Sequence, residues 1–148
     1  MPRVRQPSGT RSYAAAGLAA GLAWRALEPR RQRLFGHPYS DPELLTSFIP
    51  RGRLQPLLDY CVQGSGGAAF GSVFARLGGR GTTRAIAATL GENAVLLALS
   101  PLVDRWHPDV RSGRWPPLTG NARAAAVSVS GHLLYALLLG ALTSRADA

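Results

Sequence analysis

The sequence predicts an all-α fold, an integral membrane bundle of four transmembrane helices with a short interfacial helix in its first loop. Four apolar segments alternate with connections rich in arginine and proline. A helix of about 20 residues, rising ~1.5 Å per residue, crosses the ~30 Å hydrocarbon core of a bilayer. Only 17% of the residues are charged, against roughly 25% in soluble proteins. The 17 glycines suit close helix packing in lipid.

The first predicted element follows a basic N-terminal tail. We expect residues 1–12 to be disordered and residues 13–148 to form one membrane domain. The first helix is predicted at residues 13–28, with Arg25 reaching the membrane surface along its aliphatic stem. A basic start before a short apolar run is also typical of a signal peptide. Against that alternative, the helical pattern continues through Trp24 without a break.

The long connection after the first helix contains the predicted interfacial helix. Ser40, Asp41, Pro42 and Glu43 are typical of a helix start, with an N-cap followed by proline and an acid in the first turn. The apolar residues that follow would form one face against the membrane surface.

Three further helices are predicted at residues 57–76, 83–104 and 122–144. A tight glycine-rich turn joins the first two of these. Pro101 lies in the last turns of the second and would kink it. The loop that follows is expected on the membrane surface. A soluble helical bundle is the alternative fold, and it would need the leucine-rich parts of the last two helices to share one core.

Two glycine pairs have the GxxxG spacing, Gly17 with Gly21 and Gly67 with Gly71. This spacing places both glycines of a pair on one helix face, where another helix can approach closely. We therefore expect these four glycines to be helix-packing residues. They are also candidates for self-association or for contact with a membrane partner protein.

Polar residues are predicted near the middle of three membrane helices. Glu92 is the most informative, because a carboxylate at that depth is costly without a partner or a task. Because consecutive helices run antiparallel, the depths of Glu92 and His132 differ by only about 5 Å. The predicted intramembrane polar cluster consists of Glu92, Asn93, His132, Gln63 and Tyr135.

Two interpretations of this cluster compete. In one, Glu92 and His132 exchange a proton or bind a cation or polar ligand, as ionisable groups do in transporters. In the other, they form a hydrogen-bonded clamp that fixes helix packing, with Glu92 protonated through desolvation. The sequence favours the clamp.

Motifs for catalysis, cofactors and metals are missing from the sequence. It contains no HExxH or GxSxG motif and no set of cysteines and histidines at metal-binding spacing. We therefore expect no enzymatic activity, no cofactor and no metal. Cys61 is the only cysteine, and we expect it to be buried and inert.

The net charge of +9 comes from 17 basic residues, all of them arginine. The arginines flank apolar segments instead of forming one run with interleaved aromatic residues. Anionic lipid headgroups are therefore the expected partner, and nucleic acid is not. The short turn around Arg80 favours a cytoplasmic location for both termini, although the raw arginine counts point the other way.

Short motifs near both ends of the chain resemble the YagU-like family of small inner-membrane proteins. The matching residues are Ala16-Gly17-Leu18-Ala19-Ala20-Gly21 with Trp24, then Glu28-Pro29-Arg30-Arg31, and Ser130-Gly131-His132-Leu133-Leu134-Tyr135. The double proline of that family is absent, and Glu92 has no counterpart in it. The resemblance implies a four-helix inner-membrane protein of uncharacterised role, with the loop motif Glu28, Arg30 and Arg31 and with His132 as positions of interest.

Together these features predict a small multi-pass protein of the inner (cytoplasmic) membrane. Its predicted role is structural or accessory, with helix packing through small residues. The alternative is a protein that handles protons or a small solute through Glu92 and His132. The sequence does not identify a substrate or an oligomeric state.

Overall fold

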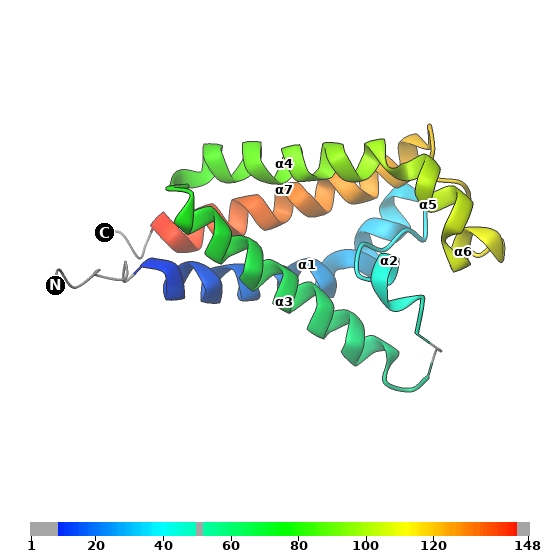
Figure 1. Cartoon of the computed structure of the whole chain (residues 1–148), viewed down its shortest axis with the longest axis horizontal. Helices are drawn as coiled ribbons and strands as arrows, with labels where there is room; N and C mark the ends of the chain where they lie inside the picture. The colour runs from blue at the N-terminus through cyan, green and yellow to red at the C-terminus, as the bar shows by residue number, and fades with distance from the viewer. Residues whose placement is uncertain (1–8, 50–51, 145–148) are drawn as a thin grey trace, which may run out of the picture.

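The computed structural model describes residues 9–49 and 52–144, and within these ranges every regular element is helical (Figure 1). The elements are α1 (Gly9–Phe35), α2 (Glu43–Thr46), α3 (Gln55–Arg76), α4 (Gly81–Ala98), α5 (Ser100–Trp106), α6 (Pro108–Arg111) and α7 (Ala122–Ser144). The all-α prediction is confirmed.

The four long helices lie in the order α3, α1, α7, α4. α1 packs along both α3 and α7, and α4 packs along α7. α3 and α4 are consecutive in the sequence but barely touch each other. They leave their shared glycine-rich turn together and then diverge toward the end of the molecule that carries α2, α5 and α6 (Figure 1). This divergence leaves space beside α1 and α7.

α1 is longer than predicted at both ends. It includes residues 9–12, which were expected in the disordered tail; residues 1–8 lie outside the described ranges. It also continues through Pro29 to Phe35, so the predicted end at residue 28 is wrong. A proline inside a helix removes one backbone hydrogen bond and costs about 3 kcal/mol, which tertiary contacts of the following turn can offset. The helix ends where Gly36 adopts φ 63°, the left-handed conformation typical of a C-terminal glycine.

The other boundaries lie closer to the predictions. α3 begins two residues earlier than residue 57, and α7 covers residues 122–144 as expected. The helix predicted at residues 83–104 is divided into α4 and α5, which meet at an angle of 48° around Leu99. Pro101 lies in the first turn of α5, so the predicted kink falls just before the proline. α2 is only one turn long.

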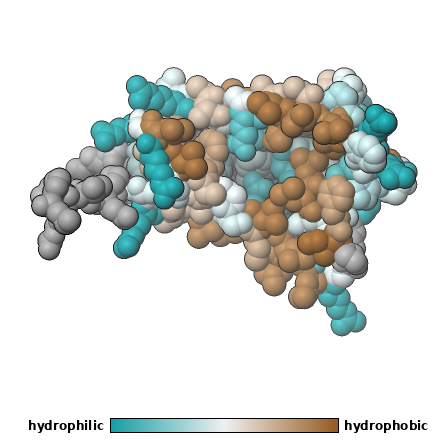
Figure 2. Space-filling model, viewed as in Figure 1, coloured by the Kyte–Doolittle hydropathy of each residue, from teal (hydrophilic) through white to brown (hydrophobic). Residues whose placement is uncertain are grey.

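Side-chain burial differs from that of a typical soluble bundle. The core between the long helices contains small residues such as Ala16, Ala20 and Ala136 together with a few aromatic side chains. Fourteen polar or charged residues are buried as well, including Glu28 and His132. Many large apolar side chains are exposed instead, and they gather over α2 with the start of α3 and over α4 with α5 (Figure 2). Extended apolar surface of this kind marks a contact with lipid or with another protein.

By length and composition, α7 can span a membrane, and so can α4 and α5 if the bent pair counts as one span. No other helix in the described ranges passes the same test. α1 carries Arg25, Glu28 and four further arginines, and α3 carries Asp59 and Gln63, so their average hydropathy is lower. The confirmed part of the prediction is therefore an all-helical chain with one clear candidate span.

Candidate functional site

The four predicted packing glycines all lie where α1 crosses α3, and we call this group the glycine crossing. A Cβ atom added to Gly17 would collide with the Gly67 carbonyl oxygen, and one added to Gly67 would collide with the Gly17 carbonyl oxygen. Gly21 faces the Gln63 backbone, and Gly71 faces the backbone of Tyr13. Only glycine allows this approach. Because the glycines pack within the chain, they are not available for contact with a second copy.

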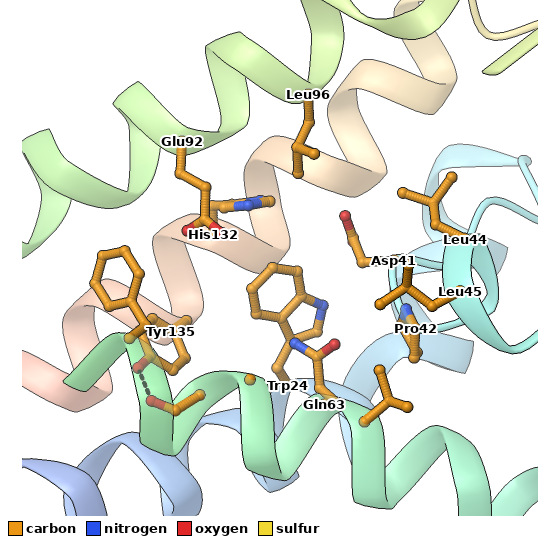
Figure 3. A pocket seen from close by; sticks show the side chains of 14 residues that line it. Trp24, Asp41, Pro42, Leu44, Leu45, Gln63, Glu92, Leu96, His132 and Tyr135 are labelled. Atoms are coloured by element: carbon orange, nitrogen blue, oxygen red, sulfur yellow. Dashed lines mark hydrogen bonds between the residues drawn. The ribbon is translucent and has the colours of Figure 1, made fainter. Parts of the chain in front are cut away.

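A cavity of about 280 Å³ lies between the diverging helices α3 and α4 (Figure 3). Most of its lining is apolar, and we call it the polar cavity for the ionisable side chains that face it. α1 and α7 form its floor, and the segment around α2 closes one end. Four of the five residues of the predicted polar cluster line it, namely Gln63, Glu92, His132 and Tyr135. Trp24 and Asp41 line it too, and neither was predicted as a residue of this cluster.

His132 forms a hydrogen bond within the protein through one of its ring nitrogens, Nδ1. It is 2% exposed, and its Nδ1 lies 2.9 Å from the carbonyl oxygen of Ser128. A carbonyl oxygen only accepts, so Nδ1–H donates, and Nε2 of the neutral ring is then an acceptor. The ring packs edge-on against Trp24, with centroids 4.6 Å apart. His132 is thus held in place, with Nε2 as its acceptor nitrogen.

Asn93 provides the contact between α4 and α7 that was expected of Glu92. Its Nδ2 donates to the Ser128 hydroxyl at 2.6 Å and lies 3.2 Å from Nδ1 of His132. No hydrogen bond or ion pair joins Glu92 to His132 in the described part of the chain. Figure 3 instead shows both side chains turned into the same cavity from neighbouring helices. The hydrogen-bonded clamp between α4 and α7 therefore consists of Asn93 and Ser128. Glu92 is exposed and stands outside it.

Asp41 brings a second carboxyl group to the cavity from the loop before α2. Its Oδ1 accepts hydrogen bonds from the Tyr39 hydroxyl at 2.9 Å and from the Ser128 hydroxyl at 3.4 Å. Its Oδ2 is buried without a hydrogen-bond partner among the described residues. Burial raises the pKa of the Asp41 carboxyl above its usual 3.8, while neighbouring His132 and the Tyr39 hydroxyl oppose the rise. Asp41 therefore combines a fixed position with one oxygen that can accept a further hydrogen bond.

An ion-pair network beside the cavity holds α1 against the α2 segment and α3. Arg25 donates to Glu28 at 2.6 Å and to Asp59 at 3.2 Å. Ser40 also donates to Glu28, and Thr46 donates to Asp59 at 2.7 Å. Arg25 was expected to extend to the membrane surface, and that expectation is wrong because two buried carboxylates bind its guanidinium within the protein.

The loop motif predicted from the family resemblance is helical, and two of its three residues are buried. Glu28 belongs to the network just described. Arg31 donates to the carbonyl oxygens of Val127 and Trp24 at 3.1 and 3.2 Å, and its guanidinium lies over the Trp24 ring. Arg30 is exposed. Arg31 therefore anchors the far side of Trp24, whose other side forms part of the cavity wall.

Two further expectations concern metals and the cysteine. The described residues contain no group of three or more histidine, cysteine, aspartate or glutamate side chains that could hold a metal ion. Cys61 is exposed on the surface of α3, so the expectation that it is buried is wrong. If the outward face of α3 contacts lipid, an apolar residue such as Cys61 can lie on that face without being buried in the protein.

Comparisons with protein-family models, with curated proteins and with solved structures found no match to this chain. The resemblance to the YagU-like family therefore stays a prediction. The function of the protein is therefore inferred from the cavity and the residues that line it.

Proposed function

We propose that this is a multi-pass inner-membrane protein that takes up protons or a small polar solute in its polar cavity. The observation that carries the proposal is the set of ionisable groups that face one space. Glu92, Asp41 and His132 come from α4, the α2 segment and α7, and they line the same cavity. Two carboxyl groups and an imidazole so arranged can accept, hold and release a proton or a cation.

The distribution of side chains supports insertion in a membrane. Fully burying a large apolar side chain is worth about 1.5–3 kcal/mol in water, yet Phe48, Leu57, Val95 and Leu102 are more than half exposed. Polar side chains occupy the interior instead and are hydrogen-bonded there. This arrangement suits a lipid environment, in which all four long helices would be embedded and anionic headgroups would contact the arginines at the ends.

The chemistry of the cavity favours a cation or a proton over an anion. Its lining contains no arginine in the part of the chain that the structure describes. Arg31 is the nearest candidate, but it lies behind the Trp24 ring and binds backbone carbonyl oxygens. An anion would meet Asp41 and Glu92 without a compensating charge, whereas a cation would be attracted by both.

The structural role that the sequence favoured has less support. That role was predicted to use the four glycines as a surface for contact with another protein. In the structure, these glycines already pack between α1 and α3 in the glycine crossing. The hydrogen bond from Asn93 to Ser128 links α4 to α7 without Glu92. A carboxyl group that has no packing partner and faces a cavity is better explained by binding. We propose uptake and transfer through this group, with no catalysed reaction.

A flux assay in liposomes tests the proposal. The full chain is reconstituted into vesicles that contain a pH-sensitive dye, a pH step is applied, and the rate of internal acidification is measured. We expect wild-type protein to accelerate acidification and Glu92→Gln to abolish the effect. Glu43→Gln makes the same change on α2 outside the cavity lining and should behave as wild type. Equal rates for wild-type and protein-free vesicles, with protons and with small organic cations alike, would refute the proposal.

Membrane insertion is tested separately by carbonate extraction of membranes from cells that express the chain. We expect the protein to stay in the membrane pellet. Its release into the supernatant would refute insertion, whatever the outcome of the flux assay.

A further inference from the structure

We infer that the ligand of the polar cavity is a small amphiphilic amino alcohol, with its polar end in this cavity and its apolar tail in a neighbouring one. The inference rests on the proposed function and specifies the chemical class of the solute. It follows from unpartnered polar atoms in the cavity wall and from a second, apolar cavity that shares part of that wall.

Two residues that line the cavity each carry a buried polar atom without a partner in the described part of the chain. One is Oδ2 of Asp41, which can only accept when the carboxyl is ionised. The other is Nε1 of Trp24, a residue that is 5% exposed, and its N–H can only donate. In Figure 3 the nitrogen edge of the Trp24 ring faces the side of the cavity on which Asp41 lies. A buried polar atom without a partner is costly, so the site suits a ligand that has both a donor and an acceptor.

An amino alcohol fits this pair of atoms and the charge around them. Its ammonium group donates to Asp41 and is attracted by Glu92, which also faces the cavity. Its hydroxyl oxygen accepts from the Trp24 N–H. The Trp24 and Tyr135 rings in the wall add a favourable contact for the cation. A carboxylate would be repelled, and a plain diol would leave Asp41 and Glu92 without a counter-ion.

An apolar tail has its own space. A second cavity of about 80 Å³ adjoins the first, and Leu44 and Leu96 line both. The remaining residues of the second cavity are mostly apolar, among them Leu97 and Val103. The second cavity is much smaller than the first, so the tail that it accepts is a short one.

The two apolar surfaces beside the cavity suit an amphiphile as well. One lies over α2 and the start of α3, the other over α4 and α5, with a more polar surface between them (Figure 2). α3 and α4 barely touch along this side. In the proposed membrane setting, a ligand dissolved in the lipid reaches the polar cavity sideways between these two helices.

Calorimetric titration of the full chain in lipid nanodiscs tests the inference, with empty nanodiscs as the blank. The probes are 2-amino-1-hexanol, 1,2-hexanediol and hexanoate. We expect saturable binding of the amino alcohol and weaker or no binding of the other two. Asp41→Asn should weaken binding of the amino alcohol roughly tenfold or more, the loss typical of a charge-assisted hydrogen bond. Glu43→Gln, outside the lining, should leave it unchanged. Binding of the diol or of hexanoate as tight as that of the amino alcohol would overturn the inference.

A second variant tests the tail cavity. Val103→Phe adds volume at a half-buried wall position, which is milder than a change in the fully buried core. It should weaken 2-amino-1-hexanol and leave 2-aminoethanol, which has no tail, at its wild-type affinity. Equal weakening of both would place the tail elsewhere and overturn that half of the inference. Proton flux that depends on Glu92 without amine binding would overturn the inference and leave the proposed function intact. Binding of the amino alcohol without proton flux would overturn the proposed function and leave the inference intact.

Discussion

The glycine crossing gives the most direct test of the fold, through a single added methyl group. Gly67→Ala places a Cβ atom against the backbone carbonyl of Gly17, and the atoms of the Tyr135 ring lie 3.2 Å away on another side. A backbone carbonyl cannot rotate away as a flexible side chain can, so α1 and α3 must move apart. Gly66→Ala makes the same change one position earlier, where an added Cβ would meet nothing within 4 Å.

The expected cost follows from three contributions. Overpacking of a tight contact costs about 1–3 kcal/mol. Alanine is the better helix former by about 1 kcal/mol, which offsets part of that. The Tyr135 hydroxyl donates to the Gly67 carbonyl at 2.7 Å, and weakening this bond adds about 1 kcal/mol. Gly67→Ala should therefore destabilise the protein by roughly 1–3 kcal/mol, whereas Gly66→Ala should be neutral or stabilise it by up to about 1 kcal/mol.

Unfolding of the purified protein in mild detergent, followed by circular dichroism during denaturation with SDS, measures both variants against wild type. The comparison of neighbouring positions removes the general effect of a Gly→Ala change on helix stability. If Gly67→Ala were as stable as Gly66→Ala, α1 and α3 would not cross at Gly17 and Gly67. The placement of Trp24 and Gln63 in the cavity wall would then fail as well.

Three further predictions concern the cavity and the surface. Asn93→Leu should reduce the free energy of unfolding by about 1–3 kcal/mol, because the buried Ser128 hydroxyl loses the donor that binds it. Glu92→Gln should stay within about 0.5 kcal/mol in the same unfolding measurement, and the reverse order would restore Glu92 to the clamp. Burial raises the pKa of Asp41, so the folded state holds this proton more tightly than the unfolded state and its contribution to stability falls as pH rises above 3.8. Asp41→Asn removes that contribution, and its stability relative to wild type should increase with pH in unfolding experiments from pH 4 upward; a constant difference would contradict the burial of this carboxyl. Cys61 is exposed on α3. If that face contacts lipid, a water-soluble maleimide should label Cys61 slowly in intact proteoliposomes and rapidly after denaturation. Fast labelling in both states would exclude a lipid contact there.

The sequence predicted the helices best where composition alone determines them. α7 and α3 are long and rich in apolar and small residues, and neither has a proline after its first turn. Their predicted ranges therefore agree with the structure to within two residues. The end of α1 was missed for a physical reason. Pro29 and the arginines after it favour a loop locally. In the structure, Arg31 donates to the carbonyl oxygen of Val127, which lies far along the chain, and this contact holds the last turns of α1 in place. Local propensity yields to such contacts, and a single sequence does not reveal them.

The same distinction explains which site residues were found. Counting residues from the helix ends gives the depth of a side chain, and this brought Glu92, Asn93 and His132 to one level. It does not give the direction in which each side chain points. Neighbouring residues on a helix differ by about 100° around its axis, so Asn93 faces α7 while Glu92 faces the cavity. Asp41 was missed because its position depends on contacts such as that with Ser128, and no local pattern encodes a contact over that separation.

The division of roles between these two neighbouring residues bears on function. A polar residue that only fixes packing is satisfied by its partner in the resting protein, and Asn93 meets that condition through Ser128. Glu92 does not: it is exposed in the described structure, and in the proposed membrane setting a carboxyl group so placed is costly to keep. In that setting packing does not recover the cost at Glu92. Binding of a proton or a cation in the cavity would recover it, which is why the absence of a Glu92–His132 bond favours uptake over a structural clamp.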